Sequence, residues 1–392
     1  METQTGLLVD VTVALGLALA GGWIATRIGV SAILGYIAAG VVISPFTPGF
    51  VGELDRLRLL ADIGVVLLLF GIGVQFSLGE LARAGARLIA STVAQTLVVF
   101  GIVAGIAGAV GADRGQALYV AAAVAISSSV VLVRMLEERN ATESDVGRTA
   151  IPWSIVQDLT AIVLILIIGA TTGASEGDRP LALEALFAGL KATAFVGGVL
   201  LIGSRVVPFV LGRVVDERSR ELFFLAIAAL ALGTALASEY AGLSLALGAF
   251  VAGLVVSESE TSQRVIHDLL PTRDVFAVLF FVAAGMLIRP GVLVDEWLAI
   301  LGVTAAIIAL KPTLAWVALR AAGRSTPTSV MAAAMLIPAA EFSFLIADAG
   351  LGDSAISEQT FGVILASSVF SIVVAPTLVA ICGRRWGAAD VA

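Results

Sequence analysis

The chain of 392 residues is poor in the side chains that build cross-links and metal sites. It has one cysteine, Cys382, which excludes an intrachain disulfide. It has one histidine, His267, which excludes a zinc site built from several histidines. Cys382 fits a small apolar position in the last helix, and His267 fits a solvated loop. Neither residue is therefore predicted to carry the function.

Charge is scarce as well. Only 14 % of the residues are charged and 59 % are hydrophobic, whereas a soluble domain usually has about 25 % charged residues. The sequence has no basic cluster that would bind nucleic acid, and residues 1–9 lack the basic region of a cleaved signal peptide. These absences predict an all-α polytopic protein in the lipid bilayer of the plasma (inner) membrane, with no nucleic-acid partner and no cofactor.

Thirteen apolar spans follow one another, and many reach the roughly 20 residues that cross a bilayer. We therefore predict 13 transmembrane helices. Their approximate limits are 7–26, 31–44, 59–76, 87–110, 115–136, 150–172, 181–211, 221–238, 242–257, 274–288, 297–320, 328–349 and 357–382.

The distribution of arginine predicts the orientation, because cytoplasmic loops carry an excess of basic residues. With the N-terminus outside and the C-terminus inside, the inner side holds sixteen arginines and the outer side five. The chain has only two lysines, Lys191 and Lys311, and both fall inside apolar spans. A buried lysine can release its proton near neutral pH, whereas arginine cannot.

An internal repeat is visible at a nearly constant offset. Residues 34–44 resemble residues 247–257, and residues 62–73 resemble residues 274–285. Span 2 therefore pairs with span 9, and span 3 with span 10. Because seven spans separate the partners, the two copies must lie in opposite orientations. Inverted-topology repeats are typical of secondary transporters, with the site at the repeat interface.

The same offset places two weak points of the helices opposite each other. Ser127, Ser128 and Ser129 lie in span 5, and Pro338 lies in span 12. Serine runs compete for backbone hydrogen bonds and proline removes a donor, so both weaken a helix. We therefore predict two crossed broken helices, whose free carbonyl groups and half-helix ends can bind ions.

Three ionisable residues lie in the middle of spans. Asp158 follows Gln157 in span 6, and a carboxylate at this depth costs roughly 2.5–3.5 kcal/mol on insertion scales. Lys311 in span 11 is the predicted counter-ion, and Glu341 in span 12 is a supporting acid. A carboxylate in a midplane cavity needs a proton, a metal cation or a lysine as its partner. Asp158 is thus the predicted shared site for protons and K⁺ or Na⁺.

Several motifs resemble those of the monovalent cation:proton antiporter-2 family, in particular its Kef-type potassium efflux members. The segments 62–70 and 127–129 resemble the family's third-span motif and its Ser-Ser-Thr segment. Gln157 and Asp158 resemble the Gln-Asp pair of the Kef branch, and Lys311 stands where the family has its core lysine. Residues 340–344 are similar to Gly-Glu-Phe-Ser-Phe, with alanine in the first place.

This resemblance implies a homodimer with a scaffold that holds the dimer interface and a core that carries the ion. Spans 1–3 and 8–10 would form the scaffold, spans 4–6 and 11–13 the core, and span 7 the linker. The corresponding segments are 1–110 (spans 1–4), 111–180 (core spans 5–6), 181–213 (linker), 214–290 (scaffold spans 8–10), 291–383 (core spans 11–13) and 384–392 (cytoplasmic tail).

The predicted function is the exchange of a monovalent alkali cation for protons by alternating access, and not an enzymatic reaction. The proposed ligands are Asp158, Gln157, Ser128 and Ser129, supported by Ser127, Glu341 and Pro338. Gln157 in place of a second acid favours K⁺ over Na⁺, by resemblance alone. The alternatives are a cation channel, a sodium-coupled organic solute carrier, and an intramembrane hydrolase using Asp158 and Glu341. Kef systems also carry a cytoplasmic nucleotide-binding domain, whose G-x-G-x-x-G fingerprint is missing here. Three alternatives follow: constitutive activity, a separate cytoplasmic regulatory subunit as a partner, or a regulatory domain removed from the chain.

Overall fold

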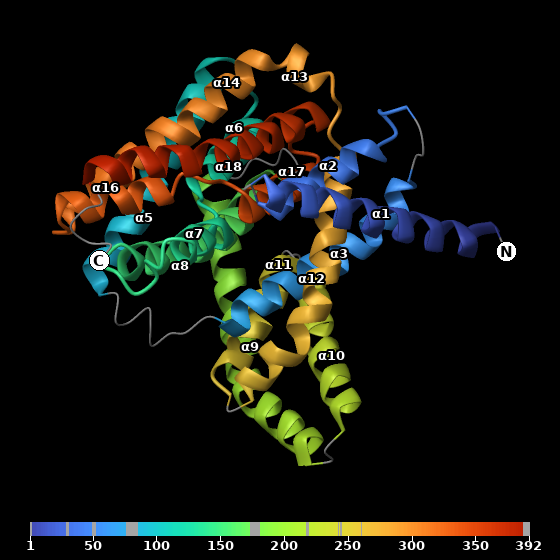
Figure 1. The fold of residues 1–392 in the computed structure, drawn as a ribbon. Helices are drawn as coiled ribbons and strands as arrows, with labels where there is room; N and C mark the ends of the chain where they lie inside the picture. The colour runs from blue at the N-terminus through green and yellow to red at the C-terminus, as the bar shows by residue number, and fades with distance from the viewer. Residues whose placement is uncertain are drawn as a thin grey trace. The chain divides into compact units, whose positions relative to one another are not determined.

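The computed structural model describes residues 2–28, 31–48, 52–75, 85–172, 181–216, 219–241, 243, 245–259 and 261–386. Within these ranges every regular element is a helix, which confirms the all-α prediction (Figure 1). The chain divides into two compact units. The first comprises Met1–Thr26, Ala32–Ser77 and Ala174–Leu287, and the second comprises Arg27–Ser31, Leu78–Gly173 and Ile288–Ala392.

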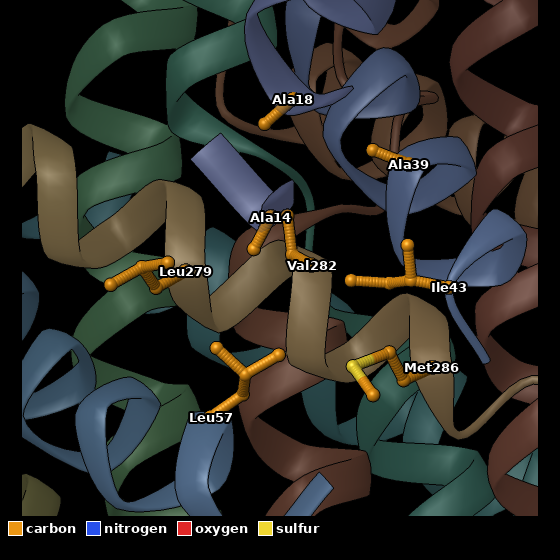
Figure 2. Close-up of a cluster of buried hydrophobic side chains, with 8 residues drawn as sticks. All are labelled: Ala14, Ala18, Ala39, Ile43, Leu57, Leu279, Val282 and Met286. Carbon is orange, nitrogen blue, oxygen red and sulfur yellow. The ribbon is translucent and has the colours of Figure 1, made fainter. Parts of the chain in front are cut away.

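The first unit packs its helices around small side chains. A buried cluster joins α1, α2, α3 and α12 through alanine, leucine, isoleucine, valine and methionine side chains, as Figure 2 shows. Its members are Ala14, Ala18, Ala39, Ile43, Leu57, Leu279, Val282 and Met286. The helices of this unit are α1 (Glu2–Arg27), α2 (Ala32–Val42), α3 (Leu54–Gln75), α9 (Leu181–Asp216), α10 (Arg220–Tyr240), α11 (Leu245–Ser257) and α12 (Ser262–Met286).

Two glycine pairs in this unit reproduce the internal repeat. Gly40 of α2 meets Gly285 of α12, and a Cβ built on Gly40 would lie 2.0 Å from the carbonyl oxygen of Val282. Gly73 of α3 meets Gly253 of α11 in the same way. Gly253 is the repeat partner of Gly40, and Gly285 that of Gly73. Each copy thus crosses the other at backbone contact, which only glycine permits.

The second unit contains the helices that carry Asp158, Lys311 and Glu341, the three ionisable residues predicted to lie in the middle of spans. Helix α6 begins after Asp113, whose side chain accepts a hydrogen bond from the Gln116 N–H, and α16 begins after Ser325 in the same manner. Helices α14 and α18 lie side by side (Figure 1). The helices are α5 (Ala86–Ala109), α6 (Arg114–Ala125), α7 (Ser129–Glu137), α8 (Gly147–Thr172), α13 (Val292–Asp295), α14 (Trp297–Ala305), the π-helix η1 (Ala306–Leu310), α15 (Lys311–Ala321), α16 (Thr326–Met335), α17 (Glu341–Gly352) and α18 (Glu358–Trp386).

Seven helices of the described residues are long and apolar enough to cross a membrane, or eight if the bent pair Ser262–Leu269 and Pro271–Met286 counts as one span. Shorter apolar helices occur at Ala32–Val42, Leu59–Gln75, Ala194–Val207 and Leu247–Ser257. The chain is therefore a multi-pass membrane protein. The count of 13 crossings, the inverted orientation of the repeats and the outside position of the N-terminus stay predictions.

Candidate functional site

Two helices of the second unit are interrupted where the sequence predicted. Helix α6 ends at Ala125, and α7 begins at Ser129 after an extended segment. Helix α16 ends at Met335, and α17 begins at Glu341. The two breaks touch, because the Ser128 N–H donates a hydrogen bond to the Pro338 carbonyl oxygen at 2.8 Å. The prediction of two crossed broken helices is confirmed.

Serine side chains tie the two broken helices together in both directions. The Ser127 hydroxyl donates to the carbonyl oxygen of Leu336 at 2.6 Å, just after α16 ends. The Ser343 hydroxyl of α17 donates to the carbonyl oxygen of Ala123 at 2.7 Å, in the last turn of α6. Each serine thereby satisfies a carbonyl group at the end of a half-helix, which would otherwise be costly to bury.

Glu341 caps the second half of the first broken helix. Its carboxylate accepts hydrogen bonds from the Ser128 hydroxyl at 2.6 Å, the Ser129 hydroxyl at 3.1 Å and the Val130 N–H at 3.2 Å. The Ser128 oxygen in turn accepts a bond from the Val131 N–H. A carboxylate is stabilised at a helix N-terminus by its partial positive charge. In this arrangement the Ser128 and Ser129 hydroxyl protons face Glu341, so their role as cation ligands stays a prediction.

Lys311 lies at the opposite end of the first break. It is fully buried, and its Nζ donates to the carbonyl oxygen of Ile126 at 3.0 Å, just beyond the C-terminus of α6. In the described part of the chain Lys311 forms this bond and no ion pair with Asp158. The physical reason is that the break frees a carbonyl at a half-helix end that carries partial negative charge. A counter-ion role at longer range stays a prediction.

The segment around Lys311 is irregular. The π-helix Ala306–Leu310 immediately precedes it, and Pro312 follows it. Single-turn π segments interrupt the regular hydrogen-bond ladder and are frequent at functional sites. Proline removes a further donor. The helix that carries Lys311 is thus locally distorted next to the break between α6 and α7.

Gln157 and Asp158 are adjacent residues of α8, and both are buried, with 1 % and 4 % exposure. Within the described part of the chain, Asp158 Oδ1 and Gln157 Oε1 have no hydrogen-bond partner. Buried oxygen atoms without a donor are rare in folded proteins and call for a bound proton, water or ion.

Gln157 also reveals residues that the sequence analysis missed. Its Nε2 donates to Gln95 Oε1 at 3.2 Å, to Ala125 O at 3.3 Å and to Thr96 Oγ1 at 3.5 Å. Gln95 and Thr96 belong to α5 and are buried. The signal in the sequence was an amide next to a hydroxyl in the middle of the apolar span 87–110. No repeat match or motif pointed to it.

The arrangement suits hard cations of low charge. Two acids, two serine hydroxyls and a glutamine amide supply oxygen atoms, which alkali cations prefer. No group of three or more His, Cys, Asp or Glu side chains that could hold a metal ion occurs among the described residues. In general, a buried carboxylate can bind a proton or a monovalent cation reversibly.

The sequence matches a family of known membrane proteins over almost its full length. The family model described as sodium/hydrogen exchanger, transmembrane, matches residues 14–384. The chain belongs to the sodium/hydrogen exchanger family. Its relatives within this family are transporters rather than enzymes.

Two relatives of this chain have names that describe cation transport. It is 38 % identical over 386 residues to the putative cation/proton antiporter YbaL of Escherichia coli, covering 97 % of this chain and 69 % of YbaL. It is 32 % identical over 325 residues to the glutathione-regulated potassium-efflux system protein KefC of Salmonella arizonae, covering 82 % of this chain and 52 % of KefC. The chain thus spans about half the length of KefC. The predicted Kef-type antiporter resemblance is confirmed.

The fold of this chain has a counterpart of known structure. The sodium proton antiporter MjNhaP1 from Methanocaldococcus jannaschii matches with a TM-score of 0.64, covering 99 % of this chain and 98 % of MjNhaP1. The two sequences are only 16 % identical, so the match shows a shared fold.

Proposed function

We propose that this chain is a secondary active antiporter that exchanges a monovalent alkali cation for protons by alternating access. The observation that carries the proposal is a pair of buried oxygen atoms on α8, Asp158 Oδ1 and Gln157 Oε1. Neither has a hydrogen-bond partner among the described residues, and α8 packs against both broken helices. A buried carboxylate is stable only when a proton or a cation neutralises it. Protons and cations therefore compete for Asp158, and this competition couples their movements.

Potassium is the proposed cation, with sodium as the second candidate. Gln157 supplies a neutral oxygen next to a single carboxylate, where a second acid would add a negative charge. The names of YbaL and KefC, a cation/proton antiporter and a potassium-efflux protein, support this choice. The transported ions are substrates, and the proposal includes no cofactor.

The proposed movement involves the second unit, which contains Asp158, Lys311 and both broken helices. The first unit would serve as the scaffold and form a homodimer in the inner membrane. Its glycine-mediated helix crossings, such as that of Gly40 with Gly285, support a rigid role. A separate cytoplasmic regulatory subunit is a further proposed partner.

The test is transport by the purified protein in vesicles that contain a fluorescent pH indicator. With an imposed proton gradient, addition of K⁺ should release protons in a saturable manner, and Na⁺ and Li⁺ should do so less effectively. Cation flux that needs no proton movement would contradict the proposal and favour a channel. Proton flux that none of the three cations stimulates would also contradict it.

A further inference from the structure

Gln95 of α5 connects α8, which carries Asp158 and Gln157, to α15, which begins at Lys311. Its side chain is 3 % exposed. Its Oε1 accepts a hydrogen bond from Gln157 Nε2 of α8 at 3.2 Å, and its Nε2 donates to the backbone carbonyl oxygen of Lys311 at 3.4 Å. One amide thus bridges α8 and α15.

The chemistry of the partners fixes the direction of this chain of hydrogen bonds. A backbone carbonyl can only accept, so the nitrogen of the Gln95 amide must face Lys311. The Gln95 oxygen then faces Gln157, and it too can only accept. The Gln157 nitrogen must therefore face Gln95. The carbonyl oxygen of Ala125, which also only accepts, lies on the same side at 3.3 Å.

The consequence appears at the other end of the Gln157 amide. With its nitrogen held by Gln95 and Ala125, the Gln157 oxygen points elsewhere and stays buried without a hydrogen-bond partner in the described part of the chain. A rotated amide would place this oxygen against two other acceptors and leave their lone pairs unpaired, at a cost of about 1–3 kcal/mol for each buried group. It would also present an NH₂ group, with its partial positive charge, in place of the oxygen.

We propose that Gln95 is a positioning residue that orients the Gln157 amide so that its oxygen binds the transported cation together with Asp158. Gln95 touches neither the cation nor the proton. It acts through Gln157 and uses the backbone of the Lys311 helix as its reference. This inference rests on the proposed function, because it presumes that Asp158 and Gln157 form the cation site.

The test compares the apparent KM for K⁺ of four proteins in the vesicle assay: the wild type, Gln95→Met, Gln157→Met and the double variant. Methionine has about the length of glutamine without its amide. Each single variant should raise the KM about tenfold, while the maximal rate changes less than twofold. The double variant should be no worse than Gln157→Met alone, because Gln95 acts only through Gln157.

Thr92→Val is the matched control. Thr92 lies one turn earlier on α5, is fully buried, and donates to the carbonyl oxygen of Leu88 in its own helix. The KM of the Thr92→Val protein for K⁺ should stay within twofold of the wild-type value. If Gln95→Met does not fold, Gln95→Asn serves instead, since its side chain is one methylene too short to reach both partners and should raise the KM similarly.

If the KM increases of the two single variants multiply, so that the double variant has a KM about a hundredfold above the wild type, Gln95 has an independent structural role. That result would overturn the inference. A wild-type KM in a folded Gln95→Met protein would overturn it as well. A different result would show that the proposed function itself is wrong. In that case the Asp158→Asn protein would retain cation-dependent proton flux, whatever the KM of the Gln95 variants.

Discussion

Glu341 is predicted to hold the break between α6 and α7 together, because one carboxylate serves three donors. The Ser128 hydroxyl bond is buried, and the Ser129 hydroxyl and Val130 N–H bonds are partly buried. In Glu341→Ala all three donors lose their acceptor. A buried donor without an acceptor costs about 1–3 kcal/mol. The two hydroxyl groups can rotate toward other acceptors, whereas the N–H cannot, so we expect a total loss of about 3 kcal/mol.

Glu341→Gln should cost less, about 1–2 kcal/mol. The amide keeps one acceptor oxygen but replaces the other with an NH₂ donor. The substitution also removes the negative charge that faces the N-terminus of α7, and this charge stabilises the helix by about 0.3–1 kcal/mol. The hydrogen bonds that remain become neutral ones and lose roughly half their strength.

The assay is thermal unfolding of the purified protein in detergent. Glu358→Ala is the control, because this carboxylate forms an exposed ion pair with Arg289, and such pairs contribute about 1 kcal/mol at most. The predicted order of destabilisation is Glu341→Ala, then Glu341→Gln, then Glu358→Ala. A Glu341→Ala protein as stable as the control would refute the capping role.

Two further predictions concern Lys311 and the glycine crossings. Lys311→Met should destabilise the protein by about 1–3 kcal/mol in the same assay, because the Ile126 carbonyl oxygen loses its donor; unchanged stability would contradict this. Gly285→Ala should destabilise by about 3 kcal/mol, the upper end for overpacking, because its Cβ would lie 2.2 Å from the Ile37 carbonyl oxygen. Gly302→Ala, where nothing lies within 4 Å, should instead stabilise its helix by about 0.5–1 kcal/mol. Equal effects of the two alanines would disprove the close-contact argument.

The helix breaks were predictable because their causes are local. Three serines in succession and a proline weaken a helix wherever they stand, and the repeat offset placed the segment with Ser127 opposite the segment with Pro338. The glycine crossings were not predicted, although the repeat places Gly40 and Gly253 at equivalent positions. What the sequence could not reveal is the hydrogen bond between the two breaks, which depends on backbone groups that every residue has.

The hydrogen bond of Lys311 was unpredictable for the same reason. The sequence displayed Asp158 as the available opposite charge, but not the Ile126 carbonyl that the break sets free. Gln95 was missed for a different reason. An isolated amide in an apolar span has many structural explanations, and only the positions of Gln157 and of the Lys311 backbone give it a specific role.

Competition between protons and cations at Asp158 is the central claim, and one measurement tests it most directly. The K⁺-dependent proton flux of Asp158→Asn is compared with that of the wild type in vesicles of the same protein content. The asparagine amide can neither bind a proton reversibly nor balance the charge of a cation. The account predicts loss of the K⁺-dependent flux in a folded protein. Flux at the wild-type level would contradict it.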